Sequence, residues 1–226
     1  MAGRPRPRQL AFALPHAESL SRDDFLEGSA NAAALSLVES WPEWPNRIML
    51  LAGPEGCGKS HLAAIWAERA GARSITAHGL NAAAGPGTLT TGALHVEDIN
   101  PPAFDEPALF HLMNLAREDG AIALLTARLP PPAVEIGLRD LRSRLRAVPA
   151  VTLLPPDDHL LRALIVKFCA DRQMNIDETV VNFIATRTER SFAAVRQAVE
   201  RLDAESLRLG RPGTRALAAE LLRGRD

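Results

Sequence analysis

The sequence has little of several features that would place it in a particular class of protein. Its 226 residues include only two cysteines, Cys57 and Cys169, which do not form a metal-ligand cluster. No uninterrupted apolar run approaches the length that spans a membrane, and the N-terminus lacks the apolar core of a signal peptide. The formal net charge is −1, so no global field draws the chain to nucleic acid. We expect a cytoplasmic protein without a membrane partner, which reaches DNA only locally or through another protein.

The hydrophobic residues of the chain are numerous enough to form a sizeable core. Hydrophobic residues make up 46% of the chain and charged residues 23%, as in ordinary soluble proteins. The length suits one good-sized domain or a domain with a smaller companion.

The strongest chemical signal lies between residues 48 and 64. An apolar run is followed by a glycine-rich turn and an alanine-rich run, which predicts a buried strand, a loop and a helix. The turn fits the pattern G-x-x-x-x-G-K-[ST] at every fixed position. Its residues, with the one that follows, are Gly53, Pro54, Glu55, Gly56, Cys57, Gly58, Lys59, Ser60 and His61.

Each fixed residue of this loop has a physical role in holding a nucleotide. The glycines let successive backbone N–H groups face phosphate oxygens, and the helix N-terminus adds partial positive charge. Lys59 would reach the outer phosphates, and the Ser60 hydroxyl would bind Mg²⁺. A chance glycine-rich turn is the alternative, which the flanking strand and helix disfavour. Cys57 lies in the loop, where a redox switch is conceivable, but we expect a plain reduced thiol.

A second polar cluster follows an apolar strand. Residues 93–99 form a run that ends in Glu97 and Asp98, which predicts Mg²⁺ and water ligands beside the phosphate loop. The alternative is a strand that ends in solvated charges. His95 is expected to pack in the fold and not to bind metal, since no second His or Cys lies at metal spacing. A later buried strand, 121–126, ends in the hydroxyl of Thr126.

Short apolar strands alternate with helices up to residue 154, which predicts an α/β fold with a mostly parallel sheet and helices on both faces. Ser29 is expected to cap the first helix, 29–39, and a further helix is expected at 104–119. After Pro155 four helices are expected, at 157–173, 177–188, 191–209 and 213–222, with N-caps at Asp157, Asp177 and Ser191. The expected domains are a flexible tail at 1–21, a nucleotide-binding α/β domain at 22–154 and a helical domain at 155–226.

The N-terminal tail allows two interpretations. Alternation of Arg and Pro over residues 4–8 disfavours helix and suggests an extended segment. The tail is then either a disordered leader or a linear peptide that docks in a partner's pocket. The residues that would dock are Gln9, Leu10, Phe12 and Leu14.

Together these motifs resemble the DnaA/Hda group of AAA+ proteins over nearly the whole chain. Gly53–Ser60 corresponds to the family's Walker A motif, residues 94–99 to Walker B, and Thr126 to the polar sensor I position. The resemblance implies a P-loop AAA+ core with a parallel five-stranded sheet, followed by a small all-helical lid domain. It also implies ADP or ATP as cofactor, with Mg²⁺ held by Ser60, Glu97 and Asp98.

The resemblance assigns roles to three further segments. Residues 24–31, with Phe25, are similar to the entry segment that lies against the base and ribose. Residues 137–145 resemble the segment that carries an arginine finger, at Arg144. The tail is similar to the family peptide that binds the β sliding clamp of DNA polymerase. The initiator's helix-turn-helix DNA-binding domain is expected to be missing, and a homodimer is possible.

Three positions depart from the family pattern. Glu97 stands where the first Walker B acid is often Asp, and Ala193 or Ala194 stands where a sensor II arginine would fall. Phe12-Ala13 replaces a more usual Leu-Pro pair in the clamp motif. A missing sensor II arginine favours a regulator with tightly held nucleotide over an efficient turnover enzyme.

The resemblance therefore implies a negative regulator of replication initiation that docks on the clamp and stimulates hydrolysis of ATP bound to the initiator DnaA. Two alternatives remain: a self-contained AAA+ ATPase or remodeller, in which Glu97, Asp98 and Thr126 are catalytic, and a clamp-tethered adaptor with structural nucleotide. A P-loop kinase is disfavoured by the helical C-terminal region. For Arg144 itself the alternative is a solvated basic face, because Arg139, Arg142 and Arg146 surround it.

Overall fold

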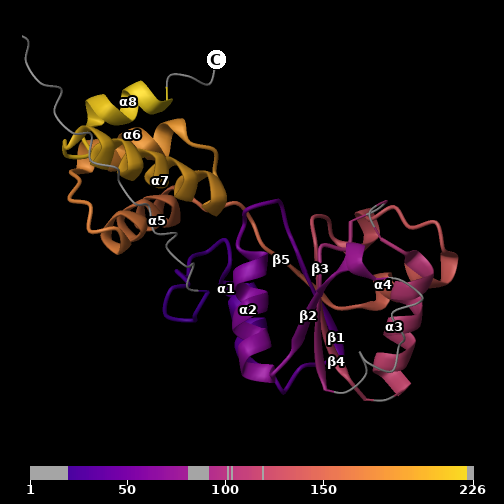
Figure 1. Cartoon of the computed structure of the whole chain (residues 1–226). Helices are drawn as coiled ribbons and strands as arrows, with labels where there is room; N and C mark the ends of the chain where they lie inside the picture. Colours follow the sequence, from indigo (N-terminus) through magenta and orange to yellow (C-terminus); the bar gives the residue numbers. More distant parts are fainter. Residues whose placement is uncertain (1–19, 81–91, 101, 103, 119, 223–226) are drawn as a thin grey trace, which may run out of the picture. The chain divides into compact units, whose positions relative to one another are not determined.

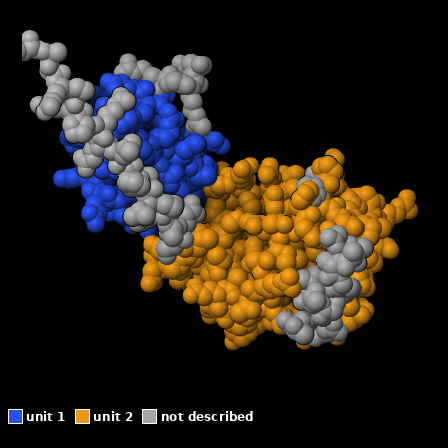
Figure 2. Space-filling model, in the orientation of Figure 1, with its two compact units in different colours: residues 1–18, 158–226 blue, residues 19–157 orange. Residues whose placement is uncertain are grey.

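The computed structural model describes residues 20–80, 92–100, 102, 104–118 and 120–222. Two compact units are present, the larger one ending at Asp157 and the smaller one beginning at Asp158 (Figure 2). Each unit has its own helices and its own buried residues, so each is described separately below.

The larger unit is built on a five-stranded parallel sheet in the order β2-β3-β4-β1-β5 (Figure 1). Its strands are β1 Ile48–Ala52, β2 Arg73–Thr76, β3 Ala93–Glu97, β4 Ile122–Ala127 and β5 Ala150–Thr152. The central strands β1 and β4 are almost wholly buried, whereas the edge strands β2 and β5 are short and largely exposed. This sheet confirms the expected α/β fold class.

Helices cover both faces of the sheet, as the alternation of strands and helices predicted (Figure 1). They are α1 Ala32–Glu39, α2 Lys59–Ala70, α3 Glu106–Glu118 and α4 Arg139–Ala147, with short 3₁₀ turns at Ala77–Gly79 and Pro131–Ala133. Met49 and Leu51 of β1 pack with α1 and α2, where Trp66 stacks on Trp44 at 5.1 Å between ring centroids. Ile48 and Leu50 point to the other face. Because successive side chains of a strand point to opposite faces of the sheet, the apolar strand β1 contributes side chains to two hydrophobic cores.

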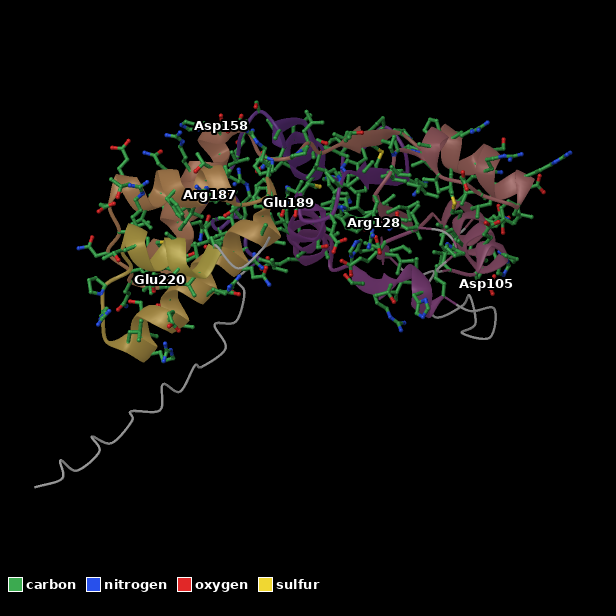
Figure 3. The ribbon with its side chains drawn as sticks, turned by 90° about the horizontal axis from the view of Figure 1, so that it is seen from above. Asp105, Arg128, Asp158, Arg187, Glu189 and Glu220 are labelled. Carbon is green, nitrogen blue, oxygen red and sulfur yellow. The ribbon has the colours of Figure 1, made fainter. Side chains whose placement is uncertain are left out.

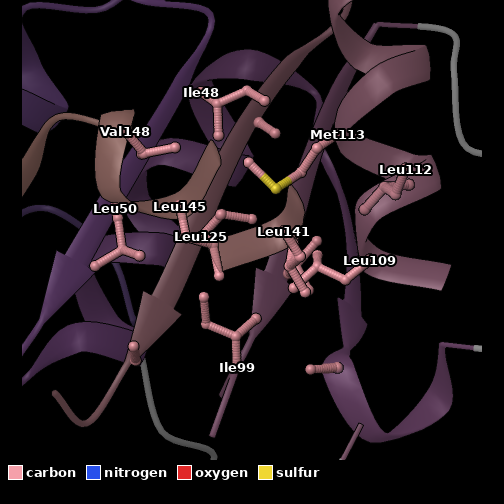
Figure 4. Packing of buried hydrophobic residues seen from close by; sticks show 14 of the residues in the cluster. Ile48, Leu50, Ile99, Leu109, Leu112, Met113, Leu125, Leu141, Leu145 and Val148 are labelled. Carbon is pink, nitrogen blue, oxygen red and sulfur yellow. The ribbon is translucent and has the colours of Figure 1, made fainter. Parts of the chain in front are cut away.

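The core beneath α3 and α4 fixes the position of both helices (Figure 4). Leu109 and Met113 of α3 and Leu141 and Leu145 of α4 meet the strand residue Leu125 in one buried cluster. Apolar residues three and four positions apart supply one continuous stripe on each helix. α4 is thereby anchored by its leucines, while the arginines between them remain outside the core.

Two helix starts differ from expectation for local reasons. The first helix begins at Ala32 with Asn31 at the N-cap position, so Ser29 lies too early in the chain to cap it. The Ser29 hydroxyl instead donates to the Asp157 carboxylate at 2.7 Å. The turn before the helix is closed by Asn31, whose side-chain oxygen accepts from the Gly28 N–H at 2.9 Å. α3 begins at Glu106, since Asp105 accepts from the Ala108 N–H at 3.0 Å and so acts as the cap.

In the described part of the smaller unit, every regular secondary-structure element is a helix. Its helices are α5 Asp158–Asp171, α6 Glu178–Arg187, α7 Phe192–Leu209 and α8 Arg215–Leu222. Asp177 accepts from the Val180 N–H at 3.0 Å and Ser191 from the Ala194 N–H at 3.1 Å, which confirms these two of the expected N-caps. Gly210, with φ of 61°, ends α7 in the left-handed conformation that glycine adopts without strain. In the part of the chain that the structure describes, no helix is long and apolar enough to cross a membrane.

A matched pair of leucines tests the core assignment. Leu125 is completely buried in β4, whereas Leu129, four residues later, is 51% exposed. We expect Leu125→Ala to lower the free energy of unfolding by about 2–5 kcal/mol and Leu129→Ala by less than about 0.5 kcal/mol. Urea titration followed by tryptophan fluorescence measures this, because Trp41, Trp44 and Trp66 all lie in the larger unit. Equal losses for the two variants would contradict the packing described.

Candidate functional site

The carboxyl ends of three neighbouring strands bring the predicted site residues together. β4 lies between β1 and β3, and all three run parallel. The register pairs Leu51 of β1 with Thr126 and Val96 of β3 with Leu125. The loop after β1, the acids at the end of β3 and Thr126 of β4 therefore share one edge of the sheet, where ligands bind in open parallel sheets.

The glycine-rich loop has the backbone that a phosphate cradle requires. Gly53, Gly56 and Gly58 have φ values of 152°, 70° and 101°. A Cβ at Gly53 would lie 2.6 Å from the Leu153 carbonyl oxygen and 2.8 Å from the Cys57 sulfur, so the position has no space for a side chain. No side chain caps the N-terminus of α2, which begins at Lys59. The first-turn N–H groups of α2 are thus suited to an anion.

Lys59 is held inside the loop and not extended into solvent. The residue is only 9% exposed, and its ammonium donates to the Gly53 carbonyl at 2.7 Å and the Pro54 carbonyl at 2.8 Å. A lysine ammonium has three donors, which a phosphate oxygen could share with these carbonyls. The loop therefore carries a positive charge already directed toward the space that it encloses.

Ser60 and Glu97 form a direct link between the loop and β3. The Ser60 hydroxyl donates to the Glu97 carboxylate at 2.7 Å. A hydroxyl and a carboxylate so placed fit the oxygen preference of Mg²⁺, which usually takes one or two protein ligands together with phosphate and water. Among the described residues no group of three His, Cys, Asp or Glu side chains could hold a metal. A Mg²⁺ ion here would thus depend on phosphate oxygens for part of its coordination.

His95 lies in β3 close to these acids but is buried. Its Nδ1 lies 3.2 Å from the Ser74 hydroxyl, and burial lowers its pKa, although the nearby Glu97 carboxylate opposes the shift. The buried imidazole agrees with the expectation that His95 packs in the fold.

Thr126 and Asp98 are joined through the backbone. The Asp98 N–H donates to the Thr126 hydroxyl at 3.0 Å, and the Ile99 N–H donates to the Thr126 carbonyl at 2.8 Å. Asp98 has φ of 64°, a left-handed conformation that is uncommon outside glycine. Thr126, itself buried, thus holds the turn in which the second acid lies.

Two residues that sequence reasoning did not select complete this network. The Asn100 amide donates to the Asp98 carboxylate, and its oxygen accepts from the Arg128 N–H at 2.8 Å. The Arg128 guanidinium lies 3.5 Å from the Glu55 carboxylate and 3.8 Å from that of Asp98. Figure 3 labels Arg128 among the side chains of the larger unit. The signal in the sequence was a polar residue shortly after each of two apolar strands: Asn100 lies three residues after β3, and Arg128 follows β4 directly.

Comparison with known proteins shows a similarity to replication initiators. No protein-family model matches the chain. The replication initiator DnaA of Thermomicrobium roseum is 26% identical over 219 residues, which cover 87% of this chain and 47% of that protein. The chain thus spans about half the length of this curated relative.

Solved structures agree with that match. Domain III of Thermotoga maritima DnaA superimposes with a TM-score of 0.78 at 18% identity, over 90% of this chain and 95% of that one. AMPPCP-bound DnaA from Aquifex aeolicus gives a TM-score of 0.70 at 15% identity, over 84% of this chain and 67% of that one. The chain is similar to DnaA in sequence and has the fold of a DnaA AAA+ domain. This confirms the expected resemblance and the expected fold.

Phe25 is placed beside the phosphate loop but is not open to a ligand. Its ring packs edge-on against His61 at 5.2 Å between centroids, and the residue is 4% exposed. The His61 Nε2 lies 2.9 Å from the Ser21 carbonyl, which ties the entry segment to α2. Phe25 and His61 thus support one another, and a contact of either with a base stays a prediction.

Arg144 lies on α4, where its side chain is partly buried. Its guanidinium lies 5.0 Å from the centroid of the Phe110 ring on α3. The start of α4 is fixed by Glu106, also on α3, whose carboxylate accepts from the N–H groups of Gly137 at 3.0 Å and Leu138 at 2.7 Å. Among the described residues Arg144 makes no hydrogen bond or ion pair with the loop. The Phe110 ring therefore holds this partly buried arginine in a defined place, unlike the exposed Arg139 and Arg146.

The tail residues Gln9, Leu10, Phe12 and Leu14 lie outside the described residues. Their assignment to clamp binding stays a prediction.

The chemistry of Cys57 can be tested directly. Both cysteines are buried, and burial raises the pKa of Cys57, against the lowering influence of Lys59, and raises that of Cys169 to about 11. Since the thiolate is the reactive form, we expect both thiols of the folded chain to react slowly with Ellman's reagent at pH 8 and faster as pH rises. Two thiols per chain should react at once in denaturant. Single Cys57→Ala and Cys169→Ala variants assign the phases, and fast labelling of native Cys57 would support a redox role instead.

Proposed function

We propose that this chain is a nucleotide-binding AAA+ regulator of DNA replication initiation, of the Hda type. The observation that carries the proposal is the convergence of the phosphate loop, the Ser60–Glu97 pair and the Thr126–Asp98 turn at one edge of a parallel sheet. Each group faces the place where a P-loop protein holds the phosphates and Mg²⁺ of its nucleotide.

The nucleotide is ADP or ATP, bound with Mg²⁺. Gly53–Ser60 and the N-terminus of α2 would surround the phosphates, and Lys59 would exchange its carbonyl partners for phosphate oxygens. Ser60, with Glu97 and Asp98, would hold the ion, which supplies positive charge against the phosphates. The Aquifex aeolicus relative, which binds the ATP analogue AMPPCP, supports this assignment.

In this proposal the ATP hydrolysis that regulates initiation takes place in a partner protein and not in this chain. Docked on the DNA-loaded β sliding clamp through Gln9, Leu10, Phe12 and Leu14, the chain would present Arg144 to ATP held by DnaA. A guanidinium at another subunit's γ-phosphate stabilises transition-state charge, and such a finger accelerates hydrolysis about 10³–10⁵-fold. Support comes from the rigid placement of α4, which Glu106 holds at its start and Phe110 supports beneath Arg144.

Efficient hydrolysis by the chain itself is less well supported. Alanine occupies positions 193 and 194, in the first turn of α7, where the family's sensor II arginine would fall. Without that second cation, the terminal phosphate has fewer charged partners during turnover. The chain is therefore better suited to keep a nucleotide as a conformational ligand than to consume it.

The first test removes the proposed finger. We expect Arg144→Ala to bring DnaA-dependent ATP hydrolysis, measured with DNA-loaded clamp, down to the unstimulated rate. Its matched control is Arg146→Ala, on an exposed position of the same helix, which should leave stimulation unchanged. Clamp binding by both variants should equal that of the unmodified chain.

Two results would contradict this assignment. Equal losses for Arg144→Ala and Arg146→Ala would indicate a general basic face, and intact stimulation by Arg144→Ala would place the finger elsewhere. Robust ATP turnover by the isolated chain, without DnaA or clamp, would favour a self-contained ATPase.

The second test concerns the tail. We expect Gln9→Ala combined with Leu10→Ala to abolish capture of the chain by immobilised β clamp, since a polar head and an apolar anchor would both be lost. His16→Ala, in the same tail but outside the motif, serves as the control and should bind as before. Unchanged capture of the double variant would remove the motif from the proposal.

A further inference from the structure

Arg128 stands where two sides of the phosphate site meet. It is the first residue after β4, and its backbone N–H is fixed by the Asn100 side chain at 2.8 Å. From there its guanidinium reaches Glu55 of the phosphate loop at 3.5 Å and Asp98, after β3, at 3.8 Å. One cation therefore contacts both the loop that would hold phosphate and the acid that would orient water.

The Asp98 carboxylate takes its direction from few partners. The backbone of Asp98 is fixed by Thr126, and its side chain meets the Asn100 amide and the Arg128 guanidinium. Asn100 belongs to the same turn and remains with it. Arg128, on a long and flexible stem, is the partner that can leave without any change in the backbone.

The two ion pairs of Arg128 are easily exchanged. The side chains of Arg128, Glu55 and Asp98 are 53%, 81% and 50% exposed, and ion pairs between such groups contribute little to stability. A planar guanidinium binds phosphate oxygens with paired hydrogen bonds at least as well as it binds carboxylate. A terminal phosphate in the loop would therefore compete with these two carboxylates for the same cation.

We propose that Arg128 distinguishes a nucleoside triphosphate from a diphosphate in this site and sets the position of the Asp98 carboxylate accordingly. With a diphosphate, Arg128 stays with Glu55 and Asp98 and keeps that carboxylate engaged. With a triphosphate, the guanidinium moves to the added phosphate, and Asp98 keeps only Asn100. The inference rests on the nucleotide binding of the proposed function and adds to it the residue that senses which nucleotide is bound.

The experiment compares affinities for two nucleotides. Dissociation constants of the full chain for ATP and ADP, each with Mg²⁺, are measured by isothermal titration calorimetry. We expect Arg128→Gln to weaken ATP binding about tenfold and ADP binding by less than about twofold, because a charge-assisted contact is lost only with the triphosphate. Arg128→Lys, which keeps the charge, should restore part of the preference.

The control is Arg117→Gln, an exposed arginine in the last turn of α3, at the end of that helix remote from Glu106. Arg117→Gln removes the same charge and should change the dissociation constant of neither ATP nor ADP. Thermal unfolding without nucleotide should be the same for Arg128→Gln and the unmodified chain, so that a structural loss would be visible. Equal effects of Arg128→Gln on ATP and ADP, or no effect on either, would overturn the inference.

The outcomes separate this inference from the proposed function. If the unmodified chain binds neither ATP nor ADP, the proposed function and the role of Arg128 both fail. If it binds both and Arg128→Gln leaves the ratio of the two constants unchanged, only the role of Arg128 fails. Stimulation of DnaA through Arg144 is measured separately and does not decide the role of Arg128.

Discussion

The parallel pairing of β4 between β1 and β3 is the constraint on which the rest of the site depends. It brings the ends of three strands to one edge, although the chain separates the phosphate loop from Thr126 by more than sixty residues. The strands remain together because alternate side chains of β1 and β4 enter two separate cores, one beneath α1 and α2 and the other beneath α3 and α4. Disturbing either core would therefore move site residues that lie outside it.

The same architecture separates two kinds of positive charge. Lys59 is enclosed by the loop and belongs to the phosphate site of this chain, whereas Arg144 is carried on α4 and is supported by α3. Glu106 caps the start of α4 from α3, so that the helix bearing the arginine is fixed to a neighbouring helix as well as to the sheet. This arrangement suits a protein that holds one nucleotide and acts on another. Arg128, between Glu55 and Asp98, lies where the state of the held nucleotide could be read.

Much of the fold was predictable because its signals are local. The loop pattern, the apolar strands and the helices after Pro155 each depend on residues close together in sequence, and the caps at Asp177 and Ser191 formed as expected. Ser29 does not cap the first helix, because that helix begins three residues later, and its hydroxyl donates to the carboxylate of Asp157, distant in sequence. The site was predicted where a motif exists, at Lys59, Ser60 and Glu97. Asn100 and Arg128 were missed because neither belongs to a motif.

The sequence by itself determined the phosphate loop, the alternation of strands and helices, and the pair of acids at the end of β3, since glycine spacing, apolar runs and chain order express these directly. Tertiary structure alone decided that Ser60 bonds to Glu97, that Thr126 holds the backbone of Asp98, and that Arg128 faces two acids. It also decided that Phe110 lies beneath Arg144. Each of these contacts joins residues at least 28 positions apart in the sequence. They therefore depend on strand order and helix packing, which no local pattern specifies.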